Sequence, residues 1–234
     1  MTLPQHIDLT IDWHCHLLPG LDDGPATLDE SFAMAHALSQ GGVKVVHCTP
    51  HFIKGSYEHS PDQVRAAITK LQEELSQGGI QLELRPGMEY MLDEFFSEQL
   101  TNPLPLGDTN LLLVEAYPSL PFEQLKETIF EIVRSGLTPL LAHPERNALL
   151  ASPATQPGLL SRLTGKKGGR EEVSLCVTEL ASLGCRFQGN LGSLTGYYGR
   201  HVQSQALIFA SENIYDLYGS DAHSLAQCHN MLTP

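Results

Sequence analysis

The 234-residue chain lacks long apolar runs, a leader-like N-terminus and paired cysteines. No apolar run approaches the roughly 18–20 residues that cross a bilayer, so we expect no membrane insertion. The N-terminus, MTLPQHIDLT, has no basic region followed by an apolar core, so a signal peptide is not predicted. A cytoplasmic location is therefore the default expectation.

The five cysteines are odd in number, irregularly spaced and without a CxxC pair. This excludes a disulfide framework and a zinc ribbon, and favours reduced, buried thiols. Basic residues are also few: 14 Lys and Arg face 27 Asp and Glu, for a net charge of −13. Such a surface repels nucleic acid and anionic membranes. The acidity is typical of a cytosolic protein, and part of it is also consistent with a cation site.

Apolar runs alternate with amphipathic helical patterns along the chain. A capping box at Thr27 marks one helix start, and Ser60 followed by Pro61 at the first helical position marks another. Further helices are expected near 122–133, 173–183 and 201–211. Residues 151–172, with the sequence TGKKGGR, indicate a helical segment broken by a solvated loop, and 191–199 indicate a turn-rich loop. The runs predicted as strands are 7–17, 43–49, 80–84, 111–114, 138–142, 185–190 and 214–217. Continuous apolar strands alternating with helices predict an α/β fold with a parallel sheet, in one domain over 1–234.

Metal-ligand side chains lie at or just past the ends of these strands. His14 and His16 are two residues apart, so on a strand they point to the same side. The C-terminal strand ends of an α/β barrel carry its active site. The candidates are His14, His16, Asp23, His51, Glu89, Glu115, His143, Asp221 and His223. Five imidazoles and four carboxylates are too many for one ion and suit two or three divalent ions that share a bridging carboxylate.

Imidazole with carboxylate favours Mn²⁺, Fe²⁺ or Zn²⁺ and excludes Cu(I) and iron–sulfur clusters. Three divalent ions and four carboxylates leave about two positive charges, which suits a phosphate-ester dianion. Two positions keep alternatives. Asp23 competes with Asp22 as a ligand and is also compatible with a turn residue beside Gly24-Pro25, and Glu115 is also compatible with an ion pair. Tyr197 and Tyr198 either pack their loop or line a substrate cleft.

The set HxH, DDGP, TPH, GxE, HPER and SDAH resembles the PHP (polymerase and histidinol phosphatase) superfamily. LDDGP, HPER and the stretch 190–199 are most similar to the bacterial protein tyrosine phosphatases of capsule and exopolysaccharide operons. The resemblance covers most of the chain and implies a distorted (β/α)7 barrel with a trinuclear metal site, Mn²⁺ being the expected ion. It assigns His14, His16, Glu89 and Asp221 to one ion, Glu89, Glu115 and His143 to a second, and Asp23, His51 and His223 to a third.

The same resemblance implies that Arg146 clamps phosphate, as a catalytic residue together with His143 and Asp23, against a salt bridge of Arg146 with Glu145. It implies a phosphotyrosine protein as substrate, the tail of a membrane tyrosine autokinase. The alternatives are a histidinol or nucleotide phosphatase of the same fold and a catalytically weakened, metal-stabilised binding module. Two departures support the last: residues 224–229 (SLAQCH) lack the arginine of the subgroup, for which His229 is the candidate substitute, and 11 residues follow His223.

Overall fold

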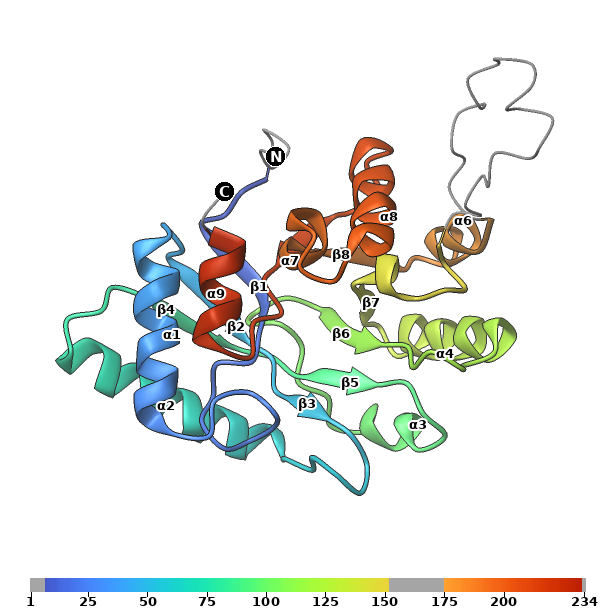
Figure 1. Cartoon of the computed structure of the whole chain (residues 1–234). Coiled ribbons are helices and arrows are strands. Elements are labelled where there is room, and N and C mark those ends of the chain that lie inside the picture. The colour runs from blue at the N-terminus through green and yellow to red at the C-terminus, as the bar shows by residue number, and fades with distance from the viewer. Residues whose placement is uncertain (1–6, 152–174, 233–234) are drawn as a thin grey trace, which may run out of the picture.

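The computed structural model describes residues 7–151 and 175–232 (Figure 1). The predicted helical segment with the TGKKGGR loop lies outside the described residues. Within the described ranges, no helix has both the length and the apolar character that a membrane span requires.

All strand pairs are parallel and form two sheets. The first has the order β1-β2-β4 and the second has the order β3-β5-β6-β7-β8-β9. The strands are β1 (Ile11–Cys15), β2 (Val45–Cys48), β3 (His51–Phe52), β4 (Glu83–Pro86), β5 (Glu89–Met91), β6 (Leu111–Glu115), β7 (Thr138–Ala142), β8 (Arg186–Asn190) and β9 (Leu217–Gly219). Short breaks at Thr49-Pro50 and Gly87-Met88 separate β2 from β3 and β4 from β5, so nine short strands occupy seven strand positions.

The segment that follows β9 is joined to β1 by two backbone hydrogen bonds. The amide of Asp221 donates to the carbonyl of His14 at 2.7 Å, and the amide of His16 donates to the carbonyl of Ala222 at 3.1 Å. The curled sheet thus returns to its first strand. The predicted α/β class, with a parallel sheet curled in a distorted barrel, is confirmed.

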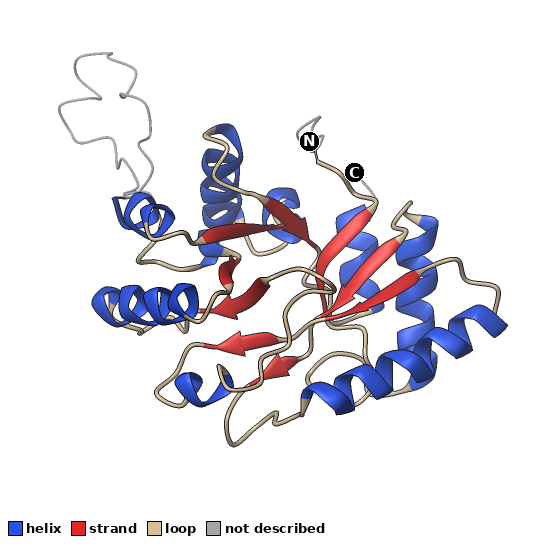
Figure 2. Cartoon of the chain, turned by 180° about the vertical axis from the view of Figure 1, so that it is seen from behind, coloured by secondary structure: helices blue, strands red, loops and turns tan. Residues whose placement is uncertain are grey.

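Helices cover the outside of the curled sheet (Figure 2). They are α1 (Leu28–Gln40), α2 (Pro61–Gln77), α3 (Phe96–Gln99), α4 (Phe122–Arg134), the 3-10 turn η1 (Pro144–Arg146), α6 (Leu175–Ser182), α7 (Leu191–Thr195), α8 (Arg200–Ser211) and α9 (Leu225–Leu232). Both helix starts are confirmed: the predicted capping box is present at Thr27, and the structure shows a second one at Ser60. The expectation of a loop over 191–199 was wrong at its start, because the Asn190 side chain accepts the amide of Ser193 and begins the short helix α7.

Several strands begin later than the sequence predicts, and helix ends explain the difference. Ile80 and Ile214 were expected to begin strands, but their amides donate to Leu75 and Phe209, five residues back at the ends of α2 and α8. The preceding residue has a positive φ in each case, +75° at Gly79 and +55° at Asn213. This is the hydrogen-bond pattern of a Schellman motif, in which the apolar residue packs on the helix end. The strand starts only after that residue.

Candidate metal centre

Four buried side chains from three strand ends converge on one point. His14 and His16 come from β1 and the residue after it, Glu89 begins β5, and Asp221 follows β9. His14 Nε2 and His16 Nε2 are 3.1 Å apart, and each lies 3.3–3.4 Å from Glu89 Oε2 and 3.3 Å from Asp221 Oδ1. A regular tetrahedron with such edges has its corners about 2.0 Å from its centre, which is the bond length of a divalent ion to nitrogen or oxygen.

Hydrogen bonds at the far ring nitrogens orient both imidazoles. His14 Nδ1 lies 3.0 Å from Gln188 Oε1, and His16 Nδ1 lies 2.6 Å from Asp22 Oδ2. Because both acceptors are oxygens, the Nδ1 atoms carry the protons and the Nε2 lone pairs face the shared point. A carboxylate behind a histidine in this way is the arrangement that fixes the tautomer of a metal ligand and raises its basicity.

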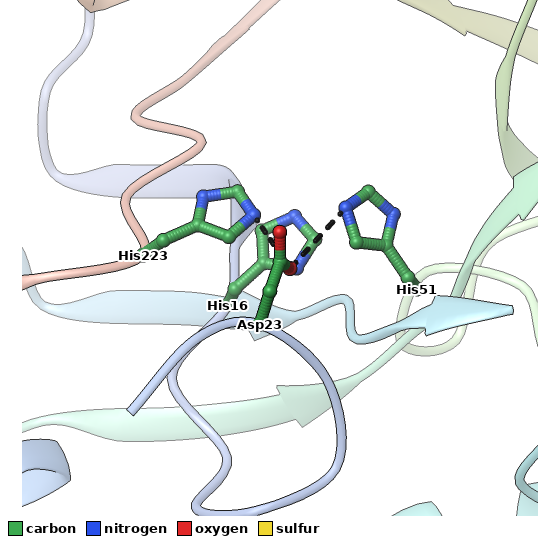
Figure 3. Close-up of side chains that lie close together, drawn as sticks. All are labelled: His16, Asp23, His51 and His223. Atoms are coloured by element: carbon green, nitrogen blue, oxygen red, sulfur yellow. Dashed lines mark ion pairs between the residues drawn. The ribbon is translucent and has the colours of Figure 1, made fainter. Parts of the chain in front are cut away.

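A second cluster lies beside the first and contains His16, Asp23, His51 and His223 (Figure 3). Asp23 Oδ1 is 3.6 Å from His51 Nε2 and 3.4 Å from His223 Nε2. The His223 ring stacks on the His16 ring with centroids 3.8 Å apart. Asp23 is the carboxylate of this cluster, while its neighbour Asp22 turns back toward His16 and also accepts the amide of His51 at 2.9 Å. The two adjacent aspartates thus have different surroundings.

A third cluster is centred on Glu89, which faces His51 and Glu115. His51 Nδ1 is 2.9 Å from Glu89 Oε2, whereas His143 Nε2 is 3.3 Å from Glu89 Oε1 and 3.8 Å from Glu115 Oε1. Glu89 therefore presents one oxygen to each side, which is the geometry of a bridging carboxylate. The structure brings all nine predicted residues into these adjoining clusters; their role as ligands stays a prediction.

The chemistry of the clusters fits divalent cations. Both oxygens of Glu89 and Nδ1 of His51 are buried without a well-formed hydrogen bond within the described residues. Burial alone would lower the pKa of His14, but the carboxylates of Glu89 and Asp221 raise this pKa to about 9. Burial and the adjacent Glu89 likewise raise the pKa of Glu115. Buried lone pairs that face one another in an anionic pocket need a cation, so the residue set fits two or three metal ions.

Backbone geometry is strained at two residues of the centre. His143 has φ +33° and Asp221 has φ +53°, and Asn213 is the other non-glycine residue with positive φ in the described ranges. Such conformations cost free energy and tend to occur at functional sites. The two oxygens of Asp221 have different partners: Oδ1 faces His14 and His16, and Oδ2 accepts from Asn190 Nδ2 at 3.0 Å.

Arg146 follows His143 on η1 and lies at the edge of the clusters. Its Nη1 donates to Asp221 Oδ2 at 2.6 Å, so its ion pair is with Asp221. The alternative pairing with Glu145 is not seen: Glu145 is buried and accepts from the Asn190 amide and the Tyr215 hydroxyl. Arg146 opens onto a cleft of about 300 Å³. Its lining residues are Asp23, His51, Glu115, His143, Arg146, Tyr198, Asp221, His223 and Gln227.

Sequence reasoning missed several residues that support this centre. Gln188 lies inside a predicted strand and gave no signal, and Asp22 was considered only as a rival of Asp23. Gln227 lines the cleft in the region where the subgroup carries an arginine, and its Oε1 accepts the amide of His223 at 2.5 Å. His229, the candidate substitute, is not among the residues described along that cleft.

Comparisons with known proteins agree with this geometry. The family model of capsular polysaccharide synthesis proteins CpsB/CapC matches residues 10–162. The tyrosine-protein phosphatase YwqE of Bacillus subtilis is 30% identical over 221 residues, which cover 92% of this chain and 78% of that protein. The tyrosine-protein phosphatase CpsB of Streptococcus agalactiae is 25% identical over 223 residues, which cover 92% of this chain and 83% of that protein.

A solved structure is also similar. It comes from the crystal structures of YwqE from Bacillus subtilis and CpsB from Streptococcus pneumoniae, described as unique metal-dependent tyrosine phosphatases. The match has a TM-score of 0.77 at 28% identity and covers 93% of this chain and 81% of that chain. The resemblance to tyrosine phosphatases of capsule operons is confirmed.

Proposed function

This chain belongs to the CpsB/CapC family of capsular polysaccharide synthesis, and from this premise we propose that it is a metal-dependent protein-tyrosine phosphatase. The observation that carries the proposal is the convergence of His14, His16, Glu89 and Asp221 beside a cleft that Arg146 lines. The two imidazole Nε2 atoms lie 3.1 Å from each other and 3.3–3.4 Å from the two carboxylates. A cationic centre with an arginine at its edge suits a phosphate ester.

We propose two or three divalent ions, with Mn²⁺ as the preferred metal and Fe²⁺ or Zn²⁺ as alternatives, because mixed imidazole and carboxylate sets accept all three. Such ions supply Lewis-acid stabilisation of phosphoryl charge and activation of water. The first would be held by His14, His16, Glu89 and Asp221, the second by Glu89, Glu115 and His143, and the third by Asp23, His51 and His223.

The protein's own groups orient the substrate within this centre. Arg146 keeps one N–H on Asp221, which leaves the rest of its fork to donate to phosphoryl oxygens in the cleft. Asp22 and Gln188 hold the imidazoles of His16 and His14 in the required tautomer. Tyrosine is a favourable leaving group for such a site, because a phenol with a pKa near 10 needs less protonation than an alcohol.

We further propose that the phosphotyrosine protein is the tail of a membrane tyrosine autokinase of the capsule or exopolysaccharide machinery. The capsular polysaccharide description of the family supports this substrate. The cytoplasmic location and the single-domain organisation stay predictions, and both follow from the sequence arguments above.

The test compares substrates and metals. The purified protein is stripped with a chelator, reloaded with Mn²⁺, and assayed on a phosphotyrosine peptide, histidinol phosphate and a nucleoside bisphosphate. We expect turnover of the peptide by the loaded wild type, and loss of it after chelation and in His14→Ala. Preference for histidinol phosphate or the nucleotide would reassign the substrate. Full metal loading without turnover of any of the three would favour a binding module.

A further inference from the structure

Tyr198 is a cleft residue to which the proposed reaction assigns no role. We propose that Tyr198 is a positioning residue: its ring fixes the plane of the Arg146 guanidinium, so that the guanidinium is already oriented when a phosphate group binds. The inference rests on the proposed function only in taking phosphate as the group that Arg146 binds.

Two contacts together define how the guanidinium lies. Its Cζ atom is 4.6 Å from the centroid of the Tyr198 ring, within the range of a cation–π contact. Its Nη1 donates to Asp221 Oδ2 at 2.6 Å. The ion pair alone fixes one nitrogen and leaves the plane free to rotate about it. The ring removes that rotation, because the planar guanidinium lies over its face.

The ring is itself held by the α7 region. A Cβ atom at Gly192 would lie 3.0 Å from Tyr198 Cε2, so the ring packs directly against the backbone of α7. The Tyr197 ring meets it edge to face, with centroids 5.0 Å apart at 89°. Burial and the nearby Asp221 raise the pKa of Tyr198 to about 12, so the phenol is neutral at physiological pH. The neutral phenol adds no charge beside Arg146, and the ring, packed against α7 and Tyr197, meets the guanidinium with its face.

A structural role would look different from a positioning role in a double-mutant cycle. If Tyr198 only packs α7, its loss harms the protein equally with or without Arg146. If it orients Arg146, its loss has no further effect once Arg146 is gone.

The cycle comprises the wild type, Tyr198→Leu, Arg146→Ala and the double variant, each loaded with Mn²⁺. The readouts are the dissociation constant of inorganic phosphate by calorimetry, and kcat/KM on a phosphotyrosine peptide. We expect Tyr198→Leu to weaken phosphate binding about 2- to 30-fold, the range of a cation–π contact. In the Arg146→Ala background the same change should alter it less than about 2-fold. Tyr198→Phe keeps the ring face and should stay within about 2-fold of wild type.

Metal content and melting temperature are measured for every variant. If the leucine variant does not fold, Tyr198→Met takes its place in the cycle. An equal loss of phosphate affinity with and without Arg146, or no loss on removing the ring, would overturn the positioning role. Failure of the proposed function is a separate result: the wild type would turn over no phosphoester, while the phosphate-binding cycle would still report on Tyr198.

Discussion

Asp22 offers a direct test of the candidate metal centre, because it contacts His16 at the ring nitrogen that points away from the other proposed ligands. Its side chain is almost fully buried, with 1% exposed. Its Oδ2 accepts from His16 Nδ1 and from the His51 amide, and its Oδ1 accepts from the Gly24 amide. Asp22→Asn keeps the shape but replaces one acceptor oxygen with a donor. One of these N–H groups must then face an NH₂ group, and the negative charge behind His16 is lost.

The expected size of the effect follows from the carboxylate itself. Burial alone would raise the pKa of Asp22, but the hydrogen bond from His16 lowers this pKa from 3.8 to about 2. At about 1.4 kcal/mol per tenfold, this corresponds to roughly 2–3 kcal/mol of interaction with the charged form. We therefore expect Asp22→Asn to weaken Mn²⁺ binding about 30- to 100-fold, at the upper end of what outer-shell partners of metal ligands usually contribute.

The assay is competition for Mn²⁺ with a fluorescent chelator at pH 7.5, together with metal content by mass spectrometry. Asp108→Asn is the matched control, since Asp108 is exposed in the loop before β6 and the change removes the same charge. The control should bind Mn²⁺ like the wild type. An Asp22→Asn protein with wild-type affinity, within about threefold, would refute the argument that Asp22 orients a metal ligand.

Three further changes test other parts of the structure. Gly24→Ala would place a Cβ 2.6 Å from the His16 carbonyl oxygen; we expect the loop to shift and Mn²⁺ affinity, measured by the same competition, to fall about tenfold or more. Arg146→Lys keeps the charge but loses the fork; kcat/KM on the peptide should fall at least about tenfold with metal content unchanged, and an unchanged kcat/KM would exclude Arg146 as the clamp. Burial, with a smaller effect of Arg85, lowers the pKa of His47 to about 4. Between pH 6.5 and 4 the unfolded chain then binds a proton that the native state does not. The free energy of unfolding therefore decreases as the pH is lowered, by up to about 3 kcal/mol. Urea titrations at pH 7 and 4.5 should show that His47→Phe loses less free energy of unfolding between these two pH values than the wild type does. An equal loss in both proteins would contradict this.

The sequence predicted the helix starts well because their signals are local. The capping box at Thr27 depends on residues three apart, and the start at Ser60 depends on the adjacent Pro61; both helices begin at these residues. Strand starts were predicted less well, since an apolar residue that closes a helix cannot be distinguished by pattern from one that begins a strand. Ile80 and Ile214 are the examples.

The nine candidate ligands were found because parallel strands deliver their C-terminal ends to one edge, so strand position alone brings them near one another. The supporting contacts could not be found in this way. Gln188 meets His14 across 174 residues, and Arg146 meets Asp221 across 75. Such pairs depend on the side-chain directions at strand ends and on the positive φ of Asp221. Of these supporting residues, Asp22 had a local signal, as the first acid of the Asp22-Asp23 pair beside a turn.

Because β1 is joined to the segment after β9, a metal bound at this centre would also connect distant parts of the chain. His14 and Asp221 are far apart in the sequence but adjacent in the fold, where the Asp221 amide donates to the His14 carbonyl. A metal held by both would act as a cross-link that closes a loop of more than 200 residues. In the chain-entropy model such a closure is equivalent to about 5 kcal/mol, similar to a disulfide over the same span. No disulfide joins the described cysteines. The bound metal would therefore be the longest-range cross-link in the described part of the chain, and we expect the contact between β1 and the segment after β9 to open first when the metal is removed.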